Sequence, residues 1–389
     1  MEIGSFQGMK SLNRSIVLNK IRISGPISRA EIARDTKLTP PTVSKLVNEL
    51  LESELIMEGE IGESLGGRKP TLLSVNIDRF HVIGVDVGPK SIRAALCNLS
   101  GTIIACSQKR IPFPITNEEL LTLLKETIAT LATEQEVVGI GIGMHGAVDH
   151  EQGIALFAPI LHLKNIPIAS MLESDFSMPV IVDNDVRALA FGEYWLKNQE
   201  QKGTFVTVNL GHGVGAGIVH DGRLFHGEHD LAGEIGHMTI DLSGEQCSCG
   251  NIGCWQTLVS GPAIAKEAMR QLAHRKDSTL ANQAIEGKTV YEAALAGDPL
   301  AIDVLRKTGE YIGIGLTNLI HIFNPTKITI AGGVAKAHEF LLPEIKQTLW
   351  NRGLTDQAKT TEIDCSTQDQ YGTAIGAATL VLANIFLEN

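Results

Sequence analysis

Residues 233–256 read GEIGHMTIDLSGEQCSCGNIGCWQ, a stretch that gathers one histidine and three cysteines in a single short loop. Imidazole nitrogen and thiolate sulfur are the ligands of tetrahedral Zn²⁺ in proteins, and the glycines at 250 and 253 permit sharp turns between them. The alternative is a core histidine beside buried, reduced thiols, although three cysteines this close together rarely pack as core. The stretch therefore predicts one zinc ion per chain, with the ligands His237, Cys247, Cys249 and Cys254.

The bulk composition places the stretch in a multidomain protein of the cytoplasm. At 389 residues, two or three domains are expected, and 43% hydrophobic content is enough for a full core. The six cysteines, with no secretory signal and no apolar run that could span a bilayer, indicate reduced thiols, a cytoplasmic location and no membrane insertion. A net charge of −11 argues against nonspecific nucleic-acid binding by the whole molecule.

The charge is unevenly distributed along the chain. Residues 9–53 carry eight Lys/Arg and four Asp/Glu, which gives this segment a net charge of +4 within an acidic protein. Such an asymmetry indicates a DNA-reading module joined to an acidic sensor.

Three helices are predicted in the basic segment. The first covers residues 10–24, with Leu12, Ile16, Ile21 and Ile23 on one side, and ends at Gly25-Pro26. A capping box of Ser28 and Glu31 begins the second, and Thr39 with Pro40 begins the third. The buried stripe of the third helix is expected to be Val43, Leu46, Val47, Leu50 and Leu51.

A short helix, a tight turn and a helix with a polar first face are typical of a helix-turn-helix, and residues 55–73 add a predicted wing hairpin. Hydroxyl, amide and cationic side chains there suit base edges and phosphates. The alternative is a three-helix protein-interaction domain with a solvated basic face. The predicted DNA contacts are Ser28, Arg29, Thr39, Pro41, Thr42, Ser44, Lys45, Asn48, Arg68 and Lys69.

The remainder of the chain contains an internal repeat. Residues 81–105 and 204–225 both read as strand, turn, strand, turn, strand, and aligning Gly88 with Gly211 superposes Asp86 on Asn209. This self-similarity predicts two related α/β lobes with a cleft between them. A closing helix is expected at residues 371–383.

Two motifs carry a family resemblance that extends from about residue 9 to residue 380. The pattern H-x9-C-x-C-G-x-x-G-C from His237 to Cys254 and the run ISRAEIARDTKLTPPTVSKLVNELL resemble the ROK family of repressors, open reading frames and kinases. The resemblance implies a winged helix-turn-helix followed by a duplicated actin/hexokinase-like ATPase fold. The implied domains are residues 1–77, a first lobe at 78–200 and a second lobe at 201–389, with the C-terminal helix returning to the first lobe.

The resemblance also implies a sugar site between the lobes. Asn184-Asp185 matches the family's Asn-Asp pair, and Glu234 with His237 matches its G-E-x-G-H, so His237 would serve both metal and sugar. Gln256 stands where the family has a glutamate, and His145 where it commonly has proline. The alternative is that these side chains now only hold loops together. The implied effector contacts are Gly146, Asn184, Asp185, Glu234, His237 and Gln256.

Both nucleotide loops depart from the pattern of the family's kinases. In place of D-x-G-G-T-K the chain has Asp86-Val87-Gly88-Pro89-Lys90-Ser91, and Pro89 lacks a backbone N–H and cannot take a positive φ. The second loop, residues 211–217, introduces His212 and Ala216 where small residues allow close approach to phosphates. We therefore expect no catalytic residues and no enzyme activity.

These features predict a repressor of carbohydrate-utilisation genes that binds operator DNA as a homodimer or a dimer of dimers. The HMTID and CSCGNIGCW segments resemble the family's xylose repressors, and GHGVGAG resembles its glucose and N-acetylglucosamine regulators. The expected inducer is a xylose- or glucose-like monosaccharide or a sugar phosphate. Two alternatives remain: an ATP-dependent sugar kinase with a fused DNA-binding domain, and a repressor induced by a protein such as a sugar-transport component.

Overall fold

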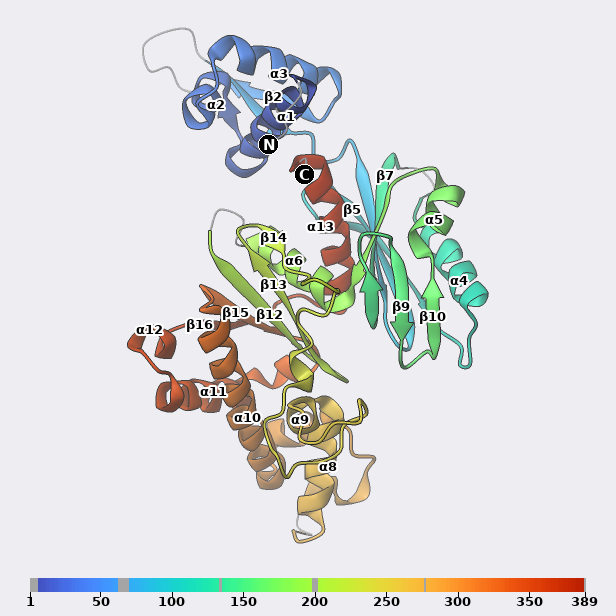
Figure 1. The fold of residues 1–389 in the computed structure, drawn as a ribbon, viewed down its shortest axis with the longest axis vertical. Coiled ribbons are helices and arrows are strands. Elements are labelled where there is room, and N and C mark those ends of the chain that lie inside the picture. Colours follow the sequence, from blue (N-terminus) through green and yellow to red (C-terminus); the bar gives the residue numbers. More distant parts are fainter. Residues whose placement is uncertain (1–5, 62–69, 133–134, 198–201, 276–277, 388–389) are drawn as a thin grey trace. The chain divides into compact units, whose positions relative to one another are not determined.

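The computed structural model describes residues 6–61, 70–132, 135–197, 202–275 and 278–387. The chain divides into two compact units (Figure 1): unit 1 holds Met1–Glu200 and Gln370–Asn389, and unit 2 holds Gln201–Asp369. Within the described part, every helix is too short or too polar to cross a membrane. Arg68 and Lys69, two of the predicted DNA contacts, lie outside the described residues.

The N-terminal part of unit 1 is built from three helices and a small antiparallel sheet of strand order β1-β3-β2. The expected caps are present: Ser28 and Glu31 form the capping box of α2, and the Thr39 side chain accepts from the Thr42 N–H at the start of α3. The elements are α1 (Phe6–Ser24), β1 (Ile27–Ser28), α2 (Arg29–Thr36), α3 (Pro40–Glu52), β2 (Ile56–Ile61) and β3 (Thr71–Val75).

The buried faces of these helices follow the prediction for α3 but not for α1. Four of the five expected α3 positions are buried, and Leu51 is half-buried. The expected face of α1 is wrong, because Leu12 is 54% exposed and Ile16 39% exposed. Ile21 is buried as expected, but spacings of three and four residues place Val17 and Leu18 beside it on the face that packs against α2, α3 and β3, in place of Leu12 and Ile16.

The rest of unit 1 is a five-stranded sheet of order β11-β7-β4-β5-β6 with helices on both faces. Along β4, Ile83, Val85 and Val87 join the core that includes α4 and α5, whereas Gly84 faces α13. The strands are β4 (His81–Val87), β5 (Ser91–Asn98), β6 (Ile103–Arg110), β7 (Val137–Met144) and β11 (Val180–Asn184), with a smaller sheet of β8 (Ala147–Asp149), β9 (Ile154–Ala158) and β10 (Leu163–Ile166). The helices are α4 (Asn117–Ala129), α5 (Ile168–Phe176), α6 (Asp185–Lys197) and α13 (Gly372–Phe386).

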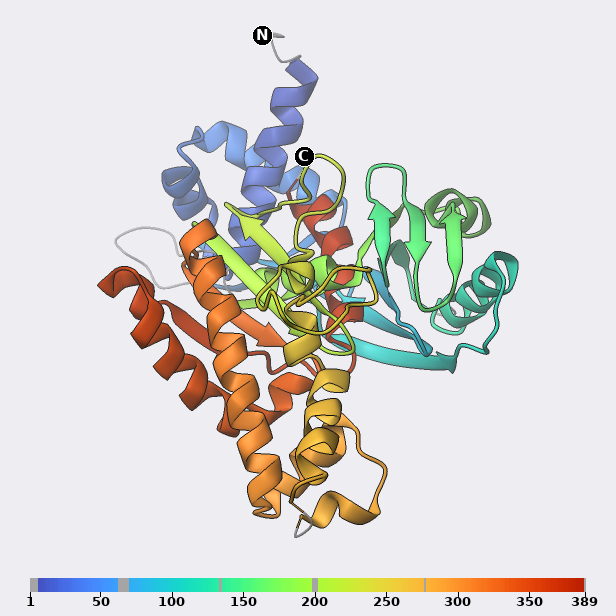
Figure 2. The ribbon, with the colours of Figure 1, turned by 60° about the horizontal axis from the view of Figure 1, so that its bottom comes forward.

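Unit 2 repeats this sheet with the order β14-β13-β12-β15-β16, in which each strand has a counterpart in unit 1. The predicted duplicated α/β fold is therefore confirmed. Its long helix α10 (Pro299–Phe323) packs along α11 (His338–Arg352), as Figure 2 shows. The other elements are β12 (Thr204–Leu210), β13 (Val214–His220), β14 (Arg223–Leu224), β15 (Lys327–Ala331), β16 (Glu362–Cys365), α7 (Gln256–Val259), α8 (Gly261–Leu272), α9 (Gly287–Leu295) and α12 (Asp356–Lys359).

Helix α13 lies directly on its neighbours in unit 1, backbone against backbone. A Cβ added at Gly84 would lie 1.9 Å from the Ala374 carbonyl oxygen, and one at Gly141 would lie 1.9 Å from that of Ala377. A Cβ at Gly376 would lie 2.2 Å from the Ala188 carbonyl oxygen of α6. Only glycine fits these positions, and together they allow α13 to pack directly on the sheet and on α6.

This contact predicts that Gly141→Ala destabilises the protein, because the new methyl group meets rigid backbone rather than a movable side chain. We expect a loss of about 2 kcal/mol or more in the free energy of unfolding, measured by urea denaturation. Gly333→Ala is the matched control, since a Cβ at Gly333 meets no atom within 4 Å. Equal stability of the two variants would contradict the close contact.

Candidate metal centre and effector site

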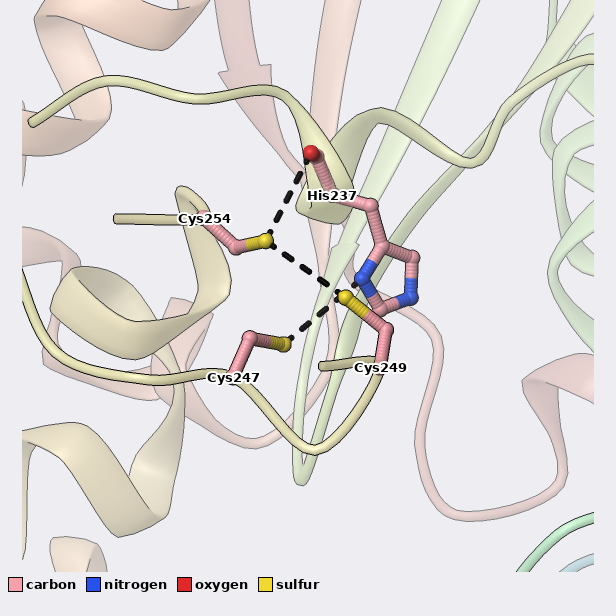
Figure 3. A group of neighbouring side chains, drawn as sticks. All are labelled: His237, Cys247, Cys249 and Cys254. Carbon is pink, nitrogen blue, oxygen red and sulfur yellow. Dashed lines mark hydrogen bonds between the residues drawn. The ribbon is translucent and has the colours of Figure 1, made fainter. Parts of the chain in front are cut away.

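The four predicted metal ligands come together in unit 2, and Figure 3 shows their side chains converging on one point. The Sγ atoms of Cys249 and Cys254 are 3.7 Å apart, and the Cys247 Sγ is 3.7 Å from the Nδ1 of His237. All four ligand atoms lie within 4.8 Å of one another, and the three thiols are free. A tetrahedral zinc ion places its sulfurs ~3.8 Å apart and a sulfur and a nitrogen ~3.6 Å apart, so the donor set fits this ion.

The protonation of the thiols also fits a cation. Burial opposes ionisation of Cys247, but hydrogen bonds from the backbone and side chain of Cys249, and from Gln256 and His237, lower its pKa to about 6. Burial, and after it the neighbouring sulfurs of Cys249 and Cys247, raise the pKa of Cys254 to about 12. Adjacent thiolates repel one another, so all three ionise together only when a positive ion lies between them.

We call residues 237–254, which carry the four candidate ligands, the metal loop. Trp255 anchors this loop in the core of unit 2, a role that the sequence did not reveal. Its indole ring is completely buried, and its Nε1–H donates to the Tyr311 carbonyl oxygen at 2.9 Å. The ring occupies the space that a side chain at Gly315 would fill. At Gly253, φ is 70° and a Cβ would lie 1.6 Å from the Asp241 carbonyl oxygen, so glycine is required at this turn.

Three predicted effector residues surround the metal loop. The Nε2 of His237 lies 3.8 Å from a carboxylate oxygen of Glu234, so the imidazole can bind a metal through Nδ1 and still present its other nitrogen beside Glu234. Gln256 donates from Nε2 to the Cys247 Sγ at 3.1 Å. The family's glutamate at this position has no N–H to donate, so the Gln256 amide adds support for the thiolate that a carboxylate does not give.

The other predicted effector residues meet in unit 1, where β11 passes into α6. The Asn184 Nδ2 donates to the Gly146 carbonyl oxygen and to the Asp185 Oδ1, both at 2.9 Å. The Asn184 Oδ1 accepts from the N–H groups of Val186 and Arg187, which caps α6. Asn184 thus has the loop-holding role that the sequence left open as an alternative. Its contact with an effector stays a prediction.

Asp86 and Arg93 are charged neighbours of these residues; the sequence marked Asp86 only as part of the first nucleotide loop and did not mark Arg93. Arg93 donates to Asp86 at 3.1 Å, and the His145 Nδ1 lies 4.0 Å from the Asp185 Oδ2. Burial, and after it the charge of Asp185, raise the pKa of Asp86 to about 7 against the opposing effect of Arg93. The signal was available in the register of the β4–β5 hairpin, where Asp86 lies opposite Arg93.

Some of the predicted DNA contacts are exposed side chains, and others already pair with neighbouring residues of the protein. Arg29 pairs with Glu58 of β2 at 3.0 Å. Ser28 is 4% exposed and its hydroxyl donates to Glu31 within the capping box, so the structure offers its predicted DNA contact no support. The side chains of α3 and its cap that are exposed or half-buried are Thr39, Pro41, Thr42, Ser44, Lys45 and Asn48.

A sequence profile described as the ROK family matches residues 82–384. The chain belongs to the ROK family. The xylose repressor of Caldicellulosiruptor bescii is 31% identical over 98% of both chains. A crystal structure of a ROK family transcriptional regulator, described as a homologue of the Escherichia coli Mlc protein, is 32% identical over 97% of this chain and 98% of its own, with a TM-score of 0.87.

A kinase of the ROK family matches a smaller part of the chain. The ROK family glucokinase of Streptomyces griseus, solved with glucose and AMPPNP, is 29% identical over 77% of this chain and 98% of its own, with a TM-score of 0.69. Similarity over nearly the whole chain is therefore found with the regulators described above.

The environment of Asp86 predicts a pH-dependent contribution to stability. Its carboxyl stays protonated up to about pH 7 in the folded protein, whereas an unfolded chain releases that proton near pH 4. This stabilisation is complete below about pH 4 and is lost as the pH rises to 7 and above. Asp86→Asn removes this titration, so in urea titrations the unfolding free energy of the variant should rise relative to wild type from pH 5 to pH 7 and level off above pH 7.

The control is Glu151→Gln, which alters an exposed carboxylate of the same unit. Its stability difference from wild type should stay constant over this range. A constant difference for Asp86→Asn as well would show that Asp86 titrates normally.

Proposed function

We propose that the protein is a sugar-responsive transcriptional repressor of carbohydrate-utilisation genes, with a winged helix-turn-helix at its N-terminus. The single observation that carries this proposal is similarity to regulators over 97–98% of the chain, whereas the glucokinase match covers 77% of it. The names of those relatives support operator DNA and a sugar as the two ligands.

The exposed first turns of α3 are the proposed recognition surface. Thr42 is half-buried, while Ser44, Lys45 and Asn48 are exposed. These are short hydroxyl, cationic and amide groups that suit the donors and acceptors of the major groove. One such helix reads a half-site, so the protein is proposed to bind DNA as a homodimer.

The nucleotide loops support a regulator over a kinase. The Gly88 N–H bonds to the Ser91 carbonyl within its own hairpin, and the Gly211 N–H bonds to the Gly213 carbonyl in the corresponding loop. Pro89 has no N–H to offer. Asp185 is nevertheless retained, so sugar-dependent ATP turnover that disappears in Asp185→Ala would replace this proposal with the kinase alternative.

The proposal predicts binding to DNA from upstream of the protein's own gene and release by a sugar. Fluorescence anisotropy should show tight binding that D-xylose weakens, and Asn48→Ala should weaken it by a factor of about 5 to 150, equivalent to about 1–3 kcal/mol. Lys288→Ala, an exposed lysine of unit 2, is the control. Tight binding that D-xylose, D-glucose, N-acetylglucosamine and their phosphates all leave unchanged would favour a protein inducer.

We further propose that His237, Cys247, Cys249 and Cys254 hold one structural zinc ion per chain. Elemental analysis should find one zinc per chain in the wild type and in Cys106→Ser, whose exposed thiol lies outside the cluster. Cys249→Ser should lose most of it, because one of four ligands is removed. Zinc far below one per chain in a wild-type protein that still binds DNA would contradict this.

A further inference from the structure

Arg22 of α1 is a partly buried cation held between aromatic rings of two other helices of unit 1. Its Cζ lies 3.9 Å from the ring centroid of Trp195, in the last turn of α6, and 5.4 Å from that of Phe386, at the end of α13. The guanidinium Nε and Nη2 donate to the Asn19 Oδ1 at 2.9 and 2.6 Å, which orients its plane. The two rings themselves lie 6.4 Å apart.

The contact joins the N-terminal helices to the sheet domain of unit 1 through a specific interaction. A cation over an aromatic face is attracted more strongly when water is excluded from it. Burial lowers the pKa of Arg22 to about 10, so the side chain remains charged at neutral pH. The geometry therefore holds α1 at one defined position against the ends of α6 and α13.

Helix α6 connects this contact to the predicted effector residues Asn184 and Asp185. The helix begins at Asp185, and Trp195 lies ten residues later, ~15 Å along the axis. Its side chains stack along the way, with Phe191 and Trp195 at 5.7 Å between ring centroids. Because α6 is a continuous helix, a displacement of its first turn is carried to Trp195.

An open pocket of about 230 Å³ lies at the junction of the end of α3 with the sheet, lined by Ser53, Leu55, Phe80, Leu99, Val138 and Ile385. Across the same junction, Arg79 pairs with the exposed carboxylates of Glu54 and Glu136. Exposed ion pairs contribute little to stability, so the partly buried contact of Arg22 with two aromatic rings is the stronger of these two side-chain restraints.

We propose that Arg22 is a positioning residue. It transmits effector binding at the start of α6, beside Asp185, to the DNA-binding helices through α6 and Trp195. This inference rests on the proposed function. Effector binding at the first turn of α6 shifts Trp195, and Arg22 carries that shift to α1. Without the guanidinium, the N-terminal helices still bind DNA but no longer follow the effector.

The test compares operator affinity with and without D-xylose for wild type, Arg22→Met, Arg22→Lys and the control Arg110→Met, an exposed arginine of β6. Methionine keeps the length and apolar stem of the side chain but loses the charge and plane. In wild type and Arg110→Met, the sugar should weaken DNA binding by the same factor. In Arg22→Met that factor should approach one while binding without sugar persists, and Arg22→Lys should restore part of it. An unchanged factor in Arg22→Met would overturn the inference.

A second measurement needs no sugar and separates this inference from the proposed function. If the wild type does not respond to D-xylose, that inducer is wrong, and a double-mutant cycle of Asp185→Asn and Arg22→Met on operator affinity decides the coupling. If the double variant changes operator affinity by a factor that differs from the product of the two single factors, transmission through α6 is supported. If that factor equals the product, the inference is overturned.

Discussion

The direct backbone contact of α13 with β4, β7 and α6 is the constraint on which unit 1 depends. Gly84, Gly141 and Gly376 bring carbonyl groups and Cα atoms to distances that no side chain allows. Because α13 follows unit 2 in the sequence, the chain must return from unit 2 before α13 can pack on the sheet of unit 1. Through Gly376 the same contact packs the first turn of α6, which follows Asn184, directly on α13.

The equivalent sheet of unit 2 supports the candidate metal site. Its insertion after β14 forms the metal loop, which Trp255 anchors in the core. A metal there would hold His237 in a fixed orientation, with the second imidazole nitrogen beside Glu234. Loss of the metal is then expected to disturb effector recognition before it disturbs the sheet. The predicted effector contacts and the two altered nucleotide loops lie on separate segments of the chain, so the nucleotide loops can change without altering the predicted effector contacts.

Patterns of local physics allowed much of this structure to be predicted from the sequence. The capping residues Ser28 and Thr39, the strand meanders and the spacing of the cysteines each act over a few residues, and each is found where expected. What failed depends on tertiary packing. The buried face of α1 is set by its neighbours, so Leu12 is exposed. The Arg22 contact joins residues distant in sequence, and no local pattern marks it.

In the proposed function, sugar and operator DNA bind the same protein, and each weakens the binding of the other. Linkage requires the effect to be reciprocal. Isothermal titration of D-xylose into the free protein and into its complex with operator DNA measures this directly. The account predicts that the sugar binds the complex more weakly, by the same factor by which it weakens DNA binding. Equal sugar affinity for the free protein and the complex would contradict it.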